Sequence, residues 1–176
     1  MTSAKQIASA MKRAESVLKR RPGAALAADA PALARWEGGM RVVTRLDAGP
    51  SFSTDMPEEL GGSGDRISPG WLLRAGLASC LTTRIAMAAA VEGIELEAIE
   101  VMASSRSDAR GLLGMPGGAG EPIGPGPFDV TLQVRICAPG IPPERLRALV
   151  EYSQTHSPVS AALSEPVTIS LSVEAI

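Results

Sequence analysis

The sequence predicts an α+β fold in which antiparallel strands surround a long, buried central helix. An apolar stretch over residues 72–91 follows Ser68-Pro69, and a helix that is apolar nearly all round belongs inside a structure. Segments with the alternating pattern of half-buried strands lie on both sides of it. Two further helical segments precede the last of these strands. The strand segments are 40–46, 52–56, 94–104, 128–137 and 167–173.

Length and composition restrict the class of protein. The 176 residues suit one domain, and a hydrophobic content of 45% is ample for a core. The 17 basic and 19 acidic side chains leave a formal net charge of −2, which gives no argument for nucleic acid as a partner. One histidine and two cysteines are too few to predict a Cys/His zinc site or a disulfide scaffold.

The longest apolar run does not predict a membrane span. Arg74, Thr82, Thr83 and Arg84 interrupt it, which favours a helix of the protein core. The first residues also lack the continuous apolar stretch of a secretory signal. We therefore expect a cytoplasmic protein with no membrane partner.

The first element is an amphipathic helix over residues 3–20, with a basic side, that ends at Pro22-Gly23. Such helices bind membranes or partner helices, but packing on its own domain or on a dimer mate is the favoured interpretation. Residues 1–23 are assigned to this N-terminal amphipathic helix, and residues 24–176 to a single domain. Within that domain, 24–34 is predicted to be a linker or short helix.

A hairpin, a loop and the central helix follow. Asp47-Ala48-Gly49-Pro50 is a turn sequence between the first two predicted strands. Gly61-Gly62-Ser63-Gly64 lacks the spacing and the ending of a phosphate-binding loop, so nucleotide binding is not expected. Ser68 is a good N-cap and Pro69 a good first helical residue, and Gly93 is placed to end the helix after Glu92.

The second half contains a strand pair and two helices. The alternation of 94–104 slips near Ala98-Ile99, which predicts a bulge, and the Gly/Pro-rich segment 111–127 predicts a mobile loop. Strict alternation from residue 128 places Cys137 on the polar face of its strand. One helix is predicted from Pro142-Pro143 to about residue 155, and a shorter one from Ser157-Pro158.

Four motifs, in this order and spacing, resemble those of the OsmC/Ohr family of thiol-dependent hydroperoxide reductases. They are Trp36-Glu37-Gly38 before the first strand, Asp55-Met56-Pro57 with Gly61-Gly62, Ser68-Pro69 through Ala78-Ser79-Cys80, and His156-Ser157-Pro158-Val159-Ser160. The resemblance covers roughly residues 36–175 and leaves the N-terminal helix as an extra. It implies an OsmC-like fold and an intertwined homodimer with active sites near the interface.

The resemblance also implies a reaction. Cys80, on the central helix, would attack a small organic hydroperoxide, and in the family a second cysteine then forms a disulfide that a small thiol reductant opens. An arginine from the first strand region, here Arg41 or less well Arg45, and a glutamate early in the central helix position the thiolate. No metal or organic cofactor is needed.

The sequence departs from the family pattern at two positions. Ser157 stands where the second cysteine is expected, and Gly70 stands where the glutamate is expected. Since a hydroxyl cannot form a disulfide, an external thiol would have to reduce the Cys80 sulfenic acid. Ser157 before Pro158 is also a good N-cap, which is its favoured structural interpretation. The positive charge of Arg41 would favour the Cys80 thiolate. Because residue 70 is glycine, no carboxylate at that position would hold the guanidinium of Arg41.

Three further residues are considered as accessory groups. Cys137 is disfavoured as a second thiol because its strand position directs it away from the core. Arg84 lies one helical turn past Cys80. His156 is either a base or thiol partner near the site, or a polar residue that ends a helix, and the helix end is favoured.

Two functions therefore stay open. The chain is either an enzyme that reduces hydroperoxides through Cys80 alone, assisted by Arg41, or an OsmC-like dimer that binds a small apolar or acyl ligand near Cys80 without redox turnover. A third, structural interpretation treats Cys80 simply as a small core residue.

Overall fold

The central helix α2 spans Pro69–Glu92, and both of its ends are as the sequence predicts. At its start, the Oγ of Ser68 accepts a hydrogen bond from the backbone N–H of Trp71 at 3.2 Å. At its end, Gly93 has a φ of +71°, a left-handed conformation that glycine adopts without steric cost. The predicted cap and stop residues are thereby confirmed.

A computed structural model describes residues 3–165 and 167–175 of the chain. The chain divides into two compact units, and α2 contributes to both. The first unit contains residues 77–103, the described residues from 130 onward, and the start of the N-terminal helix. The second unit contains residues 9–76 and 104–129.

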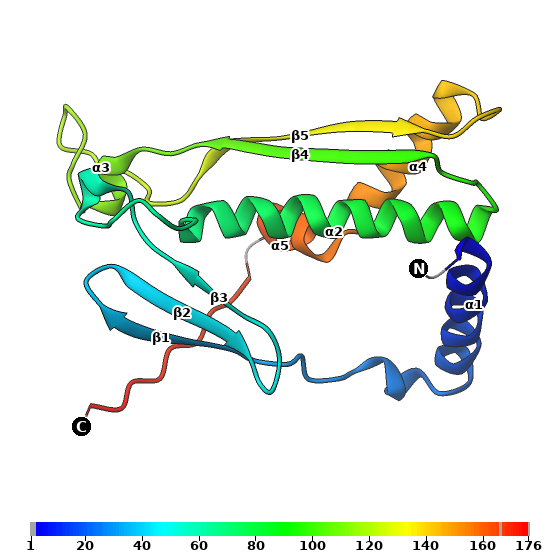
Figure 1. The fold of residues 1–176 in the computed structure, drawn as a ribbon, viewed down its shortest axis with the longest axis horizontal. Helices are drawn as coiled ribbons and strands as arrows, with labels where there is room; N and C mark the ends of the chain where they lie inside the picture. The colour runs from blue at the N-terminus through cyan, green and yellow to red at the C-terminus, as the bar shows by residue number, and fades with distance from the viewer. Residues whose placement is uncertain (1–2, 166, 176) are drawn as a thin grey trace. The chain divides into compact units, whose positions relative to one another are not determined.

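The hydrophobic core lies in the first unit. Strands β4, Ala98–Arg106, and β5, Phe128–Cys137, form a two-stranded sheet and run in opposite directions (Figure 1). Helix α4, Pro143–Thr155, and the short helix α5, Pro158–Ser164, follow β5. The buried cluster joins α2, α4 and the segments flanking β4 and β5, and it consists of Leu81, Ile85, Ala88, Ala89, Ile94, Ala138, Leu146 and Leu149. This arrangement holds the middle of α2 rigidly.

The second unit contains a three-stranded antiparallel sheet in the order β1-β2-β3 (Figure 1). The strands are β1, Ala32–Gly38, β2, Arg41–Leu46, and β3, Ser51–Thr54. Gly38 and Gly39 both have positive φ in the tight turn between β1 and β2. The hairpin of β2 and β3 confirms the predicted turn over 47–50.

Strand β1 was not predicted, and it corrects the interpretation of residues 24–34 as a linker or short helix. Trp36-Glu37-Gly38 forms the end of this strand and does not precede the first strand. Short helical turns also occur at η1, Pro22–Ala25, η2, Glu58–Leu60, and α3, Ala109–Leu112. The predicted bulge near Ala98 is instead the point where β4 begins.

The N-terminal helix α1 spans Ala4–Arg20, close to the predicted 3–20, and buries none of its described residues. The predicted last strand is absent, because the described residues 167–175 form no strand. No helix within the described ranges combines the length and the apolar character that a membrane crossing requires. The α+β class, with antiparallel sheets and a long central helix, is confirmed.

Candidate functional site

Cys80 and Ser157 are in direct contact. The hydroxyl of Ser157 donates a hydrogen bond to the sulfur of Cys80 at 3.2 Å, although the two residues are 77 positions apart in the chain. Helix α2 carries the thiol and the start of α5 carries the hydroxyl, and both belong to the first unit. Cys80 is half-buried as a residue, whereas Ser157 is fully buried.

The role of Ser157 differs from its favoured sequence interpretation. Ser157 does occupy the N-cap position of α5, but its side chain makes no capping hydrogen bond. Its side chain is fully buried and is directed at the thiol instead. The hydroxyl therefore keeps the spatial relation to Cys80 that the resemblance implies for a second cysteine.

Cys137, the other cysteine, is exposed on β5, as its strand position predicts. Its thiol donates a hydrogen bond to the carboxylate of Glu97 at 3.5 Å. This hydrogen bond raises the pKa of Cys137, and burial and the negative charge of Glu97 act in the same direction. Cys137 is consequently a poor nucleophile at neutral pH.

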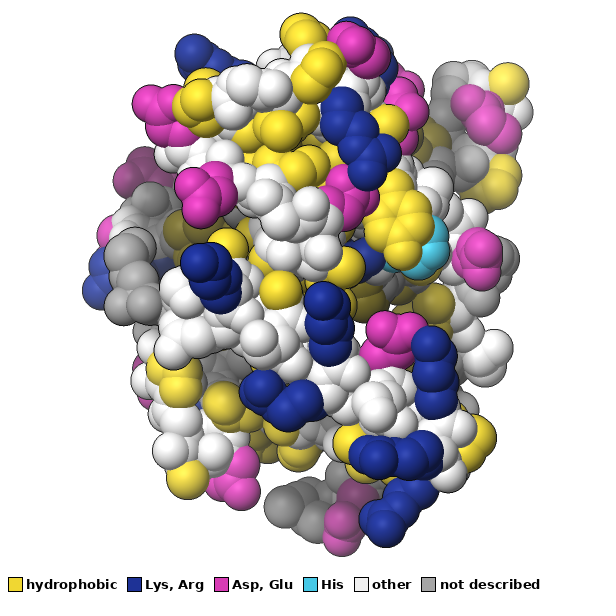
Figure 2. Space-filling model, turned by 90° about the vertical axis from the view of Figure 1, so that its right-hand side faces the viewer, with side chains coloured by type: hydrophobic (Ala, Val, Ile, Leu, Met, Phe, Trp, Pro, Cys, Tyr) yellow, Lys and Arg dark blue, Asp and Glu magenta, His cyan; other side chains and the backbone are white. Residues whose placement is uncertain are grey.

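Arg84, Tyr152 and His156 form a stacked group in the first unit. The guanidinium of Arg84 lies 5.8 Å from the centre of the Tyr152 ring, and the rings of Tyr152 and His156 are 4.1 Å apart. The histidine is visible at the surface beside a hydrophobic side chain (Figure 2). His156 is the C-cap residue of α4, and its Nδ1 lies 2.8 Å from the carbonyl oxygen of Tyr152. These contacts match a residue that ends a helix.

Arg41 belongs to the second unit, where two carboxylates and a hydroxyl hold it. Its Nη2 lies 2.7 Å from Asp65 Oδ1, 3.1 Å from Asp55 Oδ2 and 3.0 Å from Ser63 Oγ. The arginine is on β2, and its three partners lie in the segment that leads from β3 to α2. Arg41 is thus held firmly without any carboxylate at position 70.

The carboxylates around Arg41 are stabilised in their ionised form. The hydroxyl of Ser63 lies 2.6 Å from Asp55 and 2.7 Å from Asp65, and it is the main cause that lowers the pKa of each from 3.8. The backbone N–H groups of Met56 and Ser63 and the charge of Arg41 lower the pKa of Asp55 further. Since one hydroxyl hydrogen serves one acceptor at a time, Arg41 and, for Asp55, two backbone N–H groups supply further partners to the carboxylates.

Gly70 has room for a side chain. A Cβ placed there would lie 3.9 Å from Arg74 Nη1 and 4.0 Å from Ser68 Oγ, which are ordinary contact distances. Neither steric crowding nor a positive φ therefore requires glycine at this position. A cavity of about 500 Å³, lined in part by Gly70, Leu73 and Arg74, also lies here in the second unit.

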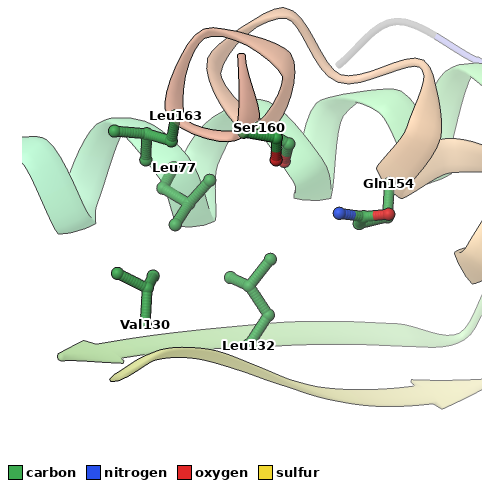
Figure 3. Close-up of a pocket in the computed structure, with 7 residues that line it drawn as sticks. Leu77, Val130, Leu132, Gln154, Ser160 and Leu163 are labelled. Atoms are coloured by element: carbon green, nitrogen blue, oxygen red, sulfur yellow. The ribbon is translucent and has the colours of Figure 1, made fainter. Parts of the chain in front are cut away.

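A second cavity lies in the first unit and has a volume of about 400 Å³. Figure 3 shows residues of α2, α5 and the end of α4 on one side of it and residues of β5 on the other. Its lining includes Leu77, Val130, Leu132, Gln154, Ser160 and Leu163. The helices on this side of the cavity, α2 and α5, also carry Cys80 and Ser157, which are in contact with each other.

Of the residues predicted for the site, the structure brings Cys80 and Ser157 together and groups Arg84 with His156. It gives Arg41 partners in its own unit. Sequence reasoning missed the roles of Asp55, Ser63 and Asp65 around Arg41, because no local pattern shows which side chains a folded loop brings to a strand. Within the described residues, no three His, Cys, Asp or Glu side chains gather as metal ligands.

Comparisons with known proteins agree with the fold described above. A family model described as OsmC-like protein matches residues 62–172. An OsmC-like protein from Mycoplasma pneumoniae has the same fold, with a TM-score of 0.65 and 13% identity over 80% of this chain and 91% of that one. An organic hydroperoxide resistance protein from Legionella pneumophila has a TM-score of 0.55 and 24% identity, over 78% of this chain and 91% of that one. The organic hydroperoxide resistance protein OhrB of Bacillus subtilis has a TM-score of 0.50 and 23% identity, over 79% of this chain and 93% of that one. A search of curated proteins found no match.

Proposed function

This chain belongs to the OsmC-like protein family, and on that premise we propose that it reduces organic hydroperoxides through the single thiol of Cys80. An external thiol completes the cycle. The observation that carries the proposal is the hydrogen bond of 3.2 Å from Ser157 to Cys80, because it joins the two positions at which the family has its thiols. The Legionella and Bacillus proteins, both named for organic hydroperoxide resistance, also support it.

The first step is an attack by the Cys80 thiolate on the outer oxygen of the hydroperoxide. A sulfur–oxygen bond forms, the oxygen–oxygen bond breaks, and the alkoxide leaves with a proton as an alcohol. The sulfur is oxidised to a sulfenic acid while the peroxide is reduced. The hydroxyl of Ser157 is a donor that an ionised sulfur accepts, so it orients the nucleophile.

The second step uses two molecules of a small thiol. The first attacks the sulfenic sulfur, releases water and forms a mixed disulfide with Cys80. The second attacks that disulfide, frees Cys80 as a thiolate and leaves as the oxidised external disulfide. Such a cycle requires a reducing compartment, and we propose the cytoplasm. An internal second thiol is not proposed, because Ser157 cannot form a disulfide and the hydrogen bond to Glu97 raises the pKa of Cys137.

Arg41 is proposed as an accessory residue only because the family resemblance implies an arginine from this strand. The family's helix glutamate has no counterpart at Gly70, but Asp55, Ser63 and Asp65 hold the guanidinium of Arg41. The loss of that glutamate therefore does not leave the arginine mobile. Arg84 and His156 are given no chemical step, because their contacts are with Tyr152.

The proposal is tested by mass spectrometry of the reduced protein after cumene hydroperoxide and dimedone, which traps sulfenic acids. We expect a dimedone adduct on Cys80. The Cys137→Ser variant is expected to form it equally, and the Cys80→Ser variant to form none. If Cys80 stays unmodified at a dose that oxidises a known thiol peroxidase, the proposed reduction is wrong.

A second candidate function is ligand binding without redox turnover. The cavity of about 400 Å³ beside the helices that carry Cys80 and Ser157 favours it, since its volume is typical of small-molecule sites. The experiment above separates the two functions. An unreactive Cys80 in a protein that still binds a small organic molecule would favour binding alone.

We also propose that the chain acts as a homodimer. Val167, Ile169, Leu171 and Val173 are 62%, 89%, 88% and 78% exposed, and they alternate along an extended segment. Four aliphatic side chains at this spacing would form one apolar face if the segment paired as a strand. A second copy of the chain, as the family resemblance implies, would cover this face.

A further inference from the structure

We propose that the N-terminal helix α1, Ala4–Arg20, binds the chain to the surface of an anionic lipid membrane and lies in the plane of that surface. This inference goes beyond the proposed function and does not rest on it, because no reacting group belongs to α1. The expectation of no membrane partner concerns segments that cross a bilayer or direct secretion. A helix that lies in the membrane surface is a different case, since it has one apolar face and one charged face along its length.

The two faces of α1 are divided by residue type. At about 3.6 residues per turn, its larger apolar side chains all fall on one half of the helix circumference and its cations on the other half. The apolar face consists of Ile7, Met11, Ala14, Val17 and Leu18. The basic face consists of Lys5, Lys12, Arg13, Lys19 and Arg20. This division, with low overall hydrophobicity, is typical of helices that lie in a membrane surface.

The apolar face of α1 has no complete cover in the structure. None of the described residues of this helix is buried, and Val17 and Leu18 are 42% and 40% exposed. Ile7 and Met11 are half-buried. A helix of this length is only marginally stable in water without packing of its apolar face. A surface that covers this face would therefore stabilise the helix.

Most of the cations on α1 have no counter-charge. Lys19 forms an ion pair with Glu15 at 2.6 Å, whereas the other four cations form no ion pair with any described residue. Five cations and one carboxylate give α1 a net charge of +4, while the whole chain carries −2, so the remaining residues carry −6. Anionic headgroups would attract this helix and repel the rest of the chain, which makes α1 the contacting element.

An anionic membrane fits both faces of α1 better than a protein or a nucleic acid does. A protein that covered the apolar face would leave the cations on the opposite half of the helix unpaired. A nucleic acid would pair with the cations but leave the apolar face in water. At a membrane surface, the apolar side chains enter the acyl region, and the long lysine and arginine side chains reach the headgroups beside the helix.

The test is co-sedimentation of the full chain with vesicles of phosphatidylglycerol and phosphatidylcholine in equal parts. Vesicles of phosphatidylcholine alone are the matched control. We expect saturable binding to the anionic vesicles and little binding to the neutral ones, because the apolar face has no aromatic side chain and needs the help of charge. Raising the salt concentration from about 0.05 M to about 0.5 M should release the protein.

One pair of variants tests the apolar face. Leu18→Gln removes an apolar side chain without a change of charge and should weaken binding to anionic vesicles about tenfold. Ser16→Gln, at an exposed position on the basic half of the helix, is the control and should bind as the starting protein does. Gel filtration and thermal melts of both variants without lipid are expected to match those of the starting protein.

A second pair of variants tests the charge. Lys12→Gln should weaken binding about fivefold, the effect of one cation near an anionic surface. Arg147→Gln removes the same charge from an exposed position of α4 and should have no effect. The Cys80→Ser protein should bind vesicles as the starting protein does, so this result is independent of whether the proposed reduction occurs.

Three outcomes would overturn the inference. The first is equal binding of the starting protein to anionic and neutral vesicles, or to neither. The second is a Leu18→Gln protein that changes its oligomeric state or loses thermal stability without lipid, because α1 would then pack against protein. The third is binding of a DNA duplex that Lys12→Gln weakens and Leu18→Gln does not, with no binding to anionic vesicles, which would assign the basic face to nucleic acid.

Discussion

At position 157 the chain has a hydroxyl whose oxygen lies 3.2 Å from the sulfur of Cys80. In the proposed reaction, a serine there can orient the thiolate, but it cannot release Cys80 from a sulfenic acid. Residue 157 would then decide whether the site resolves its own intermediate or depends on an external thiol.

The Ser157→Cys variant should restore internal resolution. Because the two side-chain ends already touch, we expect an intramolecular disulfide between residues 80 and 157 after one equivalent of hydroperoxide, seen as the loss of both free thiols. Under excess peroxide this variant should resist over-oxidation to sulfinic acid, which the starting protein should accumulate when no thiol is present. Closing a loop of 77 residues should also stabilise the oxidised variant by about 2–4 kcal/mol.

The control for this variant is Ser79→Cys, which adds a thiol beside Cys80 in sequence but at an exposed position of α2. It should form no intramolecular disulfide with Cys80. An oxidised Ser157→Cys protein in which both thiols still react with an alkylating agent would contradict the geometry given above.

At the scale of the element, the segment between β3 and α2 is organised by Arg41. Asp55 is 4% exposed; it accepts hydrogen bonds from Ser63 and from the backbone N–H of Met56, and it forms an ion pair with Arg41. These partners lower its pKa from 3.8. A carboxylate whose pKa is lower in the folded state stabilises the fold above its unfolded pKa, and this contribution is lost as the pH falls through the folded value.

We therefore expect the melting temperature to fall as the pH decreases below 3.8, the ordinary pKa of aspartate. Asp55→Asn should be less stable at neutral pH and should show a weaker dependence on pH over this acid range. The Asp47→Asn variant, at the exposed turn between β2 and β3, is the control and should behave as the starting protein does. Thermal melts recorded at several pH values decide this, and parallel curves for all three proteins would contradict the expectation.

The elements also show where sequence reasoning succeeds. The ends of α2 were predictable because Ser68, Pro69 and Gly93 act locally. The exposure of Cys137 was predictable from strand parity. Strand β1 was missed, because Ala32 and Ala34 give it no apolar alternation and its pairing with β2 is what forms it.

The candidate site was predictable only in part, for a similar reason. Motif order identified Cys80 and the position of Ser157, but the hydroxyl's partner is 77 residues away, so a local rule favoured the helix cap. The carboxylates around Arg41 depend on contacts between segments that are distant in sequence. No spacing pattern indicates such contacts.

At the scale of the whole molecule, the described C-terminal residues lack the strand that their alternation predicts. A strand needs a neighbour for its backbone hydrogen bonds, and the apolar face of residues 167–173 has none among the described residues. The prediction of a last strand is therefore wrong for the described residues, and we propose that this segment pairs as a strand only with a second copy.

The dimer proposal predicts a difference between adjacent positions of this segment. Ile169→Asp places a charge on the apolar face and should shift the protein from dimer to monomer, as measured by light scattering after gel filtration. Ser170→Asp adds the same charge to the opposite face and should leave the dimer intact. A starting protein that is monomeric at every concentration, or equal effects of the two variants, would contradict the proposal.

The half-burial of Cys80 has a further consequence for the timing of the cycle. A protein with two thiols can close its disulfide inside and be reduced later, elsewhere on its surface. In the proposed cycle, a site with one thiol receives oxidant and reductant in turn at the same sulfur atom. Any change that shields the sulfenic acid from a second peroxide would then also slow its reduction by the external thiol, so over-oxidation and repair are coupled.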